Sequence, residues 1–224
     1  MQTNIRRTHS KCARVGAMRY LVYLFFIVLM SCTEAKKEYY SNGQLMYIEH
    51  YRNGELDGKI EEYYPNGELK LSQQCKEGKL HGKVKKFDDK GSILEETSFL
   101  NGHLHGIHIQ YYPNGNPYLV GYASNGKKNG LFYTLYENGN PKFITSYKND
   151  KQHGKAVEYY ANGLIKGVEN YFFGIPHGTY ILLYPNGKID LYAHTNKGKT
   201  VYYKEFSESG ELINEFGTPA ISKR

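Results

Sequence analysis

The 224-residue chain contains 23 Tyr, 10 Phe and 24 Gly with no Trp, a mixture that favours strands and tight turns over long helices. Its formal net charge is +7. Residues 1–31 hold five basic side chains and no acidic one, so only +2 remains from Cys32 onward. This small remainder argues against a nucleic-acid-binding protein.

Residues 1–31 have the pattern of a secretory signal peptide. Basic side chains precede the apolar segment 20–30, which is shorter than the roughly 20 residues needed to span a hydrocarbon core. The following Leu29-Met30-Ser31-Cys32 resembles the lipobox of bacterial lipoproteins. The resemblance implies that Cys32 becomes the mature N-terminus and carries a lipid that holds the protein to a membrane. An ordinary cleaved signal is the alternative, and a start at Met18 would shorten it.

A 24-residue period begins after a short linker expected at residues 32–38. In each copy two aromatic or apolar residues precede a short turn that ends in Gly, as in Tyr63-Tyr64-Pro65-Asn66-Gly67. The turn residues with a structural role are Asn66, Gly67, Asn114, Gly115, Asn162, Gly163, Asn186 and Gly187. A fixed period of this length indicates an array of units that stack on their neighbours.

Each period is expected to form one β-hairpin. Pro, Asn and Gly suit a three-residue hairpin loop with a bulge, and two further glycine columns mark a second turn, as at Gly78 and Gly82. The sequence therefore predicts an all-β fold, an elongated antiparallel meander of about seven 24-residue hairpins over residues 39–216. Residues 217–224 are expected to be a C-terminal tail.

Two positions depart from the repeated pattern. Tyr122 lies four residues before its glycine, whereas Tyr51 lies three before Gly54, so we expect a β-bulge in that copy. Cys75 occupies a position where other copies place aromatic residues, which indicates a buried structural thiol and not a nucleophile.

No catalytic, cofactor-binding or metal-binding site is predicted. Four histidines, His81, His105, His153 and His177, share one column, but neighbouring repeats are about 9.6 Å apart, too far for a common ion. We interpret this column as polar turn residues. One metal ion bound weakly by His103, His105 and His108 is the alternative. Adjacent carboxylates such as Glu61 and Glu62 point to opposite faces of a strand.

A ladder of aromatic side chains is the candidate binding surface. Paired aromatics place one ring on each face of a strand, so one stripe of phenols is predicted at repeat spacing if the other face is packed. The candidates are Tyr64, Tyr112, Tyr160 and Tyr184. Exposed tyrosines interleaved with Lys and Asn suit an extended protein-binding surface.

Residues 39–216, with their Tyr-Tyr-Pro-Asn-Gly and Asn-Gly-x-x-x-Gly segments, resemble the bacterial variant of MORN repeats. Such arrays are often named toxin-antitoxin system antitoxin proteins. The resemblance and the signal together predict a non-catalytic, membrane-anchored protein-binding or scaffold module of the bacterial cell envelope, facing the periplasm or the cell surface, with an unidentified protein partner. The alternative is an antitoxin-like or immunity-type protein that neutralises one specific partner.

Overall fold

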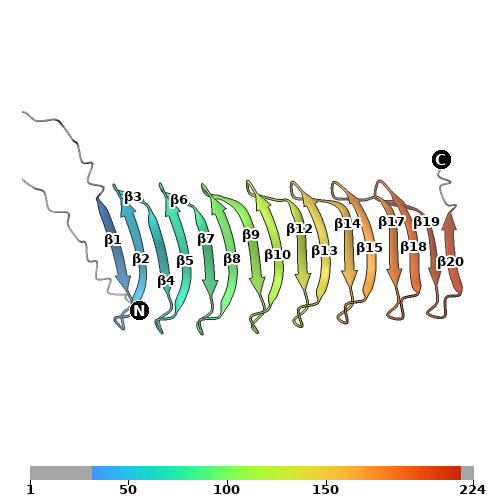
Figure 1. Cartoon of the computed structure of the whole chain (residues 1–224), viewed down its shortest axis with the longest axis horizontal. Coiled ribbons are helices and arrows are strands. Elements are labelled where there is room, and N and C mark those ends of the chain that lie inside the picture. Colours follow the sequence, from blue (N-terminus) through green and yellow to red (C-terminus); the bar gives the residue numbers. More distant parts are fainter. Residues whose placement is uncertain (1–31, 218–224) are drawn as a thin grey trace, which may run out of the picture. The chain divides into compact units, whose positions relative to one another are not determined.

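A computed structural model describes residues 32–217, and these residues form 20 β-strands and no helix (Figure 1). Among them there is accordingly no helix that could span a membrane. The predicted all-β hairpin fold is confirmed. The predicted signal peptide, residues 1–31, and the tail from residue 218 onward lie outside the described residues.

The strands follow the predicted period. Their bounds are β1 (Thr33–Tyr39), β2 (Leu45–Arg52), β3 (Glu55–Leu56), β4 (Gly58–Tyr63), β5 (Leu69–Lys76), β6 (Lys79–Leu80), β7 (Gly82–Phe87), β8 (Ile93–Leu100), β9 (His103–Tyr111), β10 (Pro117–Ser124), β11 (Lys127–Lys128), β12 (Gly130–Leu135), β13 (Pro141–Lys148), β14 (Lys151–Tyr159), β15 (Ile165–Phe172), β16 (Ile175–Pro176), β17 (Gly178–Leu183), β18 (Ile189–Asn196), β19 (Lys199–Phe206) and β20 (Leu212–Gly217). Residues 33–38, expected to be a linker, instead form most of β1, which pairs with β2.

The described residues divide into two compact units. The first extends to Ile93 and includes Phe99–Gly102, and the second comprises Leu94–Ser98 and the residues from His103 onward. Within each unit the strands pair antiparallel with their neighbours in chain order (Figure 1). Hairpins that contact only their neighbours share no central core.

The Asn-Gly turn has the expected geometry. In the second copy the Tyr64 amide donates to the Glu68 carbonyl at 2.8 Å, and the Gly67 amide donates to the Tyr64 carbonyl at 2.9 Å. Gly67 has a φ of +91°, and the strand register shifts between Glu62 and Tyr63. These features define a three-residue loop followed by a bulge, which requires a residue without a Cβ at the left-handed position.

The opposite edge of each unit has a different turn. Asn53 and Gly54 both have positive φ values, 51° and 86°, and Arg52 pairs with Glu55 across them. Two consecutive left-handed residues form the two-residue type I′ hairpin turn. The predicted second turn is therefore a tight hairpin, a two-residue strand and then a glycine that leads into the next long strand.

Each unit is a single layer, because no second layer of described residues covers either face of its sheet. We expected one face to be packed. The buried apolar side chains, such as Ile60, Cys75 and Phe132, are shielded by neighbours on the same sheet. No large side chain among the described residues is fully buried, so the sheet is stabilised mainly by strand pairing and by contacts between adjacent side chains.

The expected bulge at Tyr122 was wrong. Ala123 pairs with Gly106 in unbroken register and takes the buried column position at 7% exposure, while Tyr122 is 42% exposed. The alternation is kept because a small residue fills the column. Gly121 lies two residues before Ala123, and a Cβ on it would lie 2.1 Å from the Phe132 ring. This glycine therefore makes room for the aromatic side chain opposite.

Gly121→Ala is therefore expected to lower the free energy of unfolding by about 1–3 kcal/mol through overpacking against Phe132. The measurement is urea unfolding followed by circular dichroism. In a Phe132→Leu background the same substitution is expected to cost less, since the residue it collides with is smaller. An equal loss in both backgrounds would contradict the proposed steric cause.

Candidate binding surface

The second tyrosine of the repeated phrase bonds the next repeat. Each of these hydroxyls donates to the backbone carbonyl that ends the following repeat's long strand. The bonds are Tyr40 to Tyr63 at 2.7 Å, Tyr64 to Phe87 at 2.9 Å, Tyr112 to Leu135 at 2.8 Å, Tyr136 to Tyr159 at 2.8 Å, Tyr160 to Leu183 at 2.8 Å and Tyr184 to Phe206 at 2.9 Å. We call this set the tyrosine ladder.

The turn asparagines act in parallel with the tyrosine ladder. The side-chain oxygen of Asn66 accepts from the Glu68 amide at 3.0 Å and so closes its own loop. Its side-chain nitrogen donates to the Asp89 carbonyl of the next turn at 2.7 Å. Asn114 and Asn186 make the same pair of contacts, and Asn162 accepts from the Leu164 amide. One residue type therefore shapes the turn and connects it to the next.

The four candidate tyrosines consequently have their hydroxyls engaged inside the protein. Tyr64, Tyr112, Tyr160 and Tyr184 are half-buried, and each donates to a carbonyl of the following repeat. What they present outward is ring surface. Any partner at this edge would contact rigidly held aromatic faces.

The third copy has no tyrosine to bond the next repeat. Asp88 stands at the tyrosine position, and its Oδ1 accepts from the Ser92 amide at 2.7 Å and from the Lys90 amide at 3.0 Å. These bonds, that from Ser92 first, hold the pKa of the Asp88 carboxyl below its usual range. A carboxylate in this position closes its own turn and has no proton to donate to a neighbouring repeat.

The opposite edge carries a second ladder made of backbone groups. In five of the two-residue turns the glycine amide donates to a carbonyl about one repeat earlier. Examples are Gly78 to Leu56 at 2.8 Å, Gly126 to Leu104 at 2.8 Å, Gly174 to Gln152 at 2.7 Å and Gly198 to Pro176 at 3.0 Å. Sequence reasoning missed these bonds, although the second glycine column marked their position.

The histidines take separate structural contacts. His81 lies 3.3 Å from the Asn101 side chain, and His108 lies 2.9 Å from Thr97 Oγ1. His105 packs edge-on against Tyr122, and His153 packs against Phe173 with ring centroids 4.5 Å apart. Within residues 32–217, no three His, Cys, Asp or Glu side chains gather closely enough to hold a metal ion.

Tyrosine and glutamate side chains pair on one face of the sheet. The Tyr51 hydroxyl donates to Glu49 at 2.8 Å and the Tyr171 hydroxyl donates to Glu169 at 2.6 Å. Burial, followed by the bond to Glu169, raises the pKa of Tyr171 to about 12. Burial likewise raises the pKa of the Cys75 thiol, which keeps it protonated and unreactive as a nucleophile at neutral pH.

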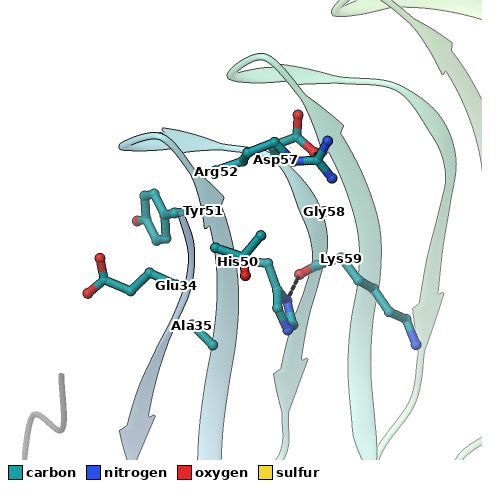
Figure 2. A pocket seen from close by; sticks show the side chains of 9 residues that line it. Glu34, Ala35, His50, Tyr51, Arg52, Asp57, Gly58 and Lys59 are labelled. Carbon is teal, nitrogen blue, oxygen red and sulfur yellow. Dashed lines mark hydrogen bonds and ion pairs between the residues drawn. The ribbon is translucent and has the colours of Figure 1, made fainter. Parts of the chain in front are cut away.

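A shallow pocket lies beside β1, β2 and β4 in the first unit (Figure 2). Figure 2 shows His50 directed at the Lys59 carbonyl, from which its Nδ1 lies 2.6 Å, and Arg52 lies 3.7 Å from Asp57. The polar groups of the pocket therefore contact each other, His50 with Lys59 and Arg52 with Asp57. At the edge of this pocket the backbone of Gly58 lies close to β2, because a Cβ on Gly58 would lie 2.9 Å from the His50 Cβ.

Comparison with known families identifies the repeats. Five segments match the MORN repeat variant model, at residues 35–53, 56–74, 80–101, 104–125 and 128–149. These five segments are therefore similar to MORN variant repeats. The same hairpin geometry continues through β14–β15 and β17–β18, beyond the matched segments.

MORN repeats are commonly protein- or membrane-binding modules and are generally not enzymatic. No curated protein matches this sequence.

Tyr160→Phe tests the tyrosine ladder. The substitution keeps the ring but leaves the Leu183 carbonyl without the phenol donor, so the free energy of unfolding is expected to fall by about 0.5–1.5 kcal/mol. Denaturant unfolding measures the change. Tyr159→Phe is the matched control, since the adjacent side chain leaves the opposite side of the strand. Equal effects of the two substitutions would contradict the structural role of the Tyr160 hydroxyl.

Proposed function

We propose that this protein is a non-catalytic, lipid-anchored MORN-repeat protein of the bacterial cell envelope, whose sheet binds a protein partner. The observation that carries the proposal is an open sheet held at both edges by hydrogen-bond ladders. Such a sheet offers broad surfaces that are already ordered before binding, which lowers the entropic cost of recognition.

The proposed anchor sits directly on the first hairpin. The Cys32 amide donates to the Asn53 side chain at 3.2 Å, and the Cys32 carbonyl accepts from the Asn53 amide at 2.9 Å. β1 begins at the next residue, Thr33. A lipid on Cys32 would therefore hold the first repeat close to the membrane without an intervening linker.

The proposed binding surface is the edge formed by the tyrosine turns in the second unit. The Tyr112 and Tyr118 rings meet edge-on at 5.2 Å, and Lys142 Nζ lies 5.6 Å from the Tyr136 ring centroid. Tyr118 is 39% exposed. Aromatic rings are enriched at protein-binding surfaces, where tyrosine supplies contact area at a low cost in side-chain entropy.

The anchor is tested by labelling cells that express the full chain with a radioactive fatty acid. Wild-type protein and Cys75→Ser are expected to take up label, and Cys32→Ser is expected to lose it. Label retained in Cys32→Ser would contradict the anchor.

The binding surface is tested in the same cells with a photo-crosslinking amino acid at position 118 and, as a control farther along β10, at position 122. Crosslinks from position 118 to an envelope protein support the proposal. Crosslinks to lipid alone would overturn it in favour of a membrane-binding sheet. A cytosolic protein whose toxicity is lost on binding would overturn it in favour of the neutralising alternative.

A further inference from the structure

One face of the second unit carries an unbroken row of apolar side chains. In β9, β10, β12 and β13 the row consists of Ile109, Val120, Tyr133 and Ile144, which are successive cross-strand partners. Directly paired residues project from the same face of a sheet. These four side chains therefore form one continuous half of the row.

The row continues over the next four long strands without a polar residue. Ile144 pairs with Val157, Val157 with Val168, and Val168 with Ile181, and Ile181 pairs with Tyr192. All eight side chains are half-buried by their neighbours. We call these eight residues, from Ile109 to Tyr192, the apolar ribbon; its strands run from green to orange in Figure 1.

The equivalent row of the first unit is polar. There Lys37 pairs with Ile48, Ile48 with Glu61, Glu61 with Ser72 and Ser72 with Lys85. The two rows have the same place in the hairpin. The 24-residue period therefore does not require apolar residues at this position, and the apolar ribbon is a property of the second unit alone.

The positions beside the apolar ribbon extend it on the side of the tyrosine turns and only in part on the other side. On the side of the tyrosine turns the strands place Leu135 opposite Pro141 and Leu183 opposite Ile189. On the other side, Ile107 is 54% exposed and Leu131 is 50% exposed. The rest of that row is Tyr122 and five polar residues, Ser146, Lys155, Asn170, Thr179 and His194. Lys155 is the sole Lys, Arg, Asp or Glu in these two flanking rows of the eight strands. This face has almost no charge with which to attract an anionic partner.

The size of this face matches one side of a stable protein interface. Eight strands at about 4.8 Å spacing and three side-chain rows at about 6.8 Å spacing cover on the order of 780 Å², against roughly 800 Å² per partner in standard interfaces. Any partner must also match a row that repeats every two strands. A second copy of this chain has that spacing by construction, and two apolar sheet faces pack about 10 Å apart.

We propose that a second copy of this chain packs face to face on the apolar ribbon to form a two-fold symmetric dimer. The interface buries the second unit's ribbon against its own equivalent and leaves the polar row of the first unit in solvent. The proposal goes beyond the protein-binding function and depends neither on the lipid nor on the tyrosine edge.

The centre of the ribbon lies between Ile144 and Val157, so a two-fold axis there brings these two residues near their own equivalents in the second copy. The test uses the full chain in the cells that express it, with Cys75→Ser as the background. Val157→Cys is expected to give a bismaleimide-crosslinked species of twice the mass of the uncrosslinked chain in the same cells. Ser72→Cys, in the equivalent row of the first unit, and the background alone are the matched controls.

Peptide mass spectrometry of the crosslinked species is expected to contain this chain only. Adding Val168→Asp to Val157→Cys is expected to reduce crosslinking at least tenfold while the circular dichroism of the strands is retained. A crosslink from position 157 to a different protein, equal crosslinking from position 72, or no doubled species would each overturn the proposal.

Discussion

The hydrogen bond from a turn tyrosine to the next repeat's backbone is the interaction on which the rest of the structure depends. Tyr160, for example, lies at the end of one hairpin and donates to the Leu183 carbonyl of the following hairpin at 2.8 Å. A single-layer sheet has no opposing layer to hold its hairpins in register. The phenol supplies a directional contact between neighbours at an edge where backbone pairing has ended.

The same constraint explains which functions the molecule can support. Its residues are shared between turns, cross-strand pairs and inter-repeat bonds, and the tyrosine hydroxyls and turn asparagines are already engaged. The groups that stand out in the sequence are therefore structural. What the sheet offers a partner is broad surface, and that surface differs between the two units, polar in the row of Glu61 and apolar in the row of Val157.

Periodicity made the fold predictable, because Gly67 and its equivalents require a left-handed turn residue at a fixed spacing. The hairpin loop and the all-β class follow from that alone. The inter-repeat bond of Tyr64 was not predictable, since spacing shows that a phenol recurs but not where its hydroxyl points. The second turn was predicted, but its two-residue form at Asn53 and Gly54 was not, because two glycine columns four residues apart mark a turn without fixing its type.

Single positions were harder to predict than the period. Tyr122 looked like a slipped column residue because it is aromatic, yet Ala123 fills the buried site. Residues 33–38 looked like a linker because their charged side chains carry no turn signal, yet they pair along β2. The apolar ribbon needed the register of eight strands, since each strand alone shows only ordinary alternation.

The central claim, that each tyrosine hydroxyl couples its hairpin to the next, is tested most directly by hydrogen exchange on Tyr136→Phe. The Tyr136 hydroxyl bonds the Tyr159 carbonyl at 2.8 Å, beside the turn closed by the Tyr160 and Gly163 amides. We predict that these two amides exchange faster in the variant while the Gly187 amide, one repeat further, keeps its wild-type rate. Unchanged exchange at Tyr160 and Gly163, or an equal increase at Gly187, would contradict the account.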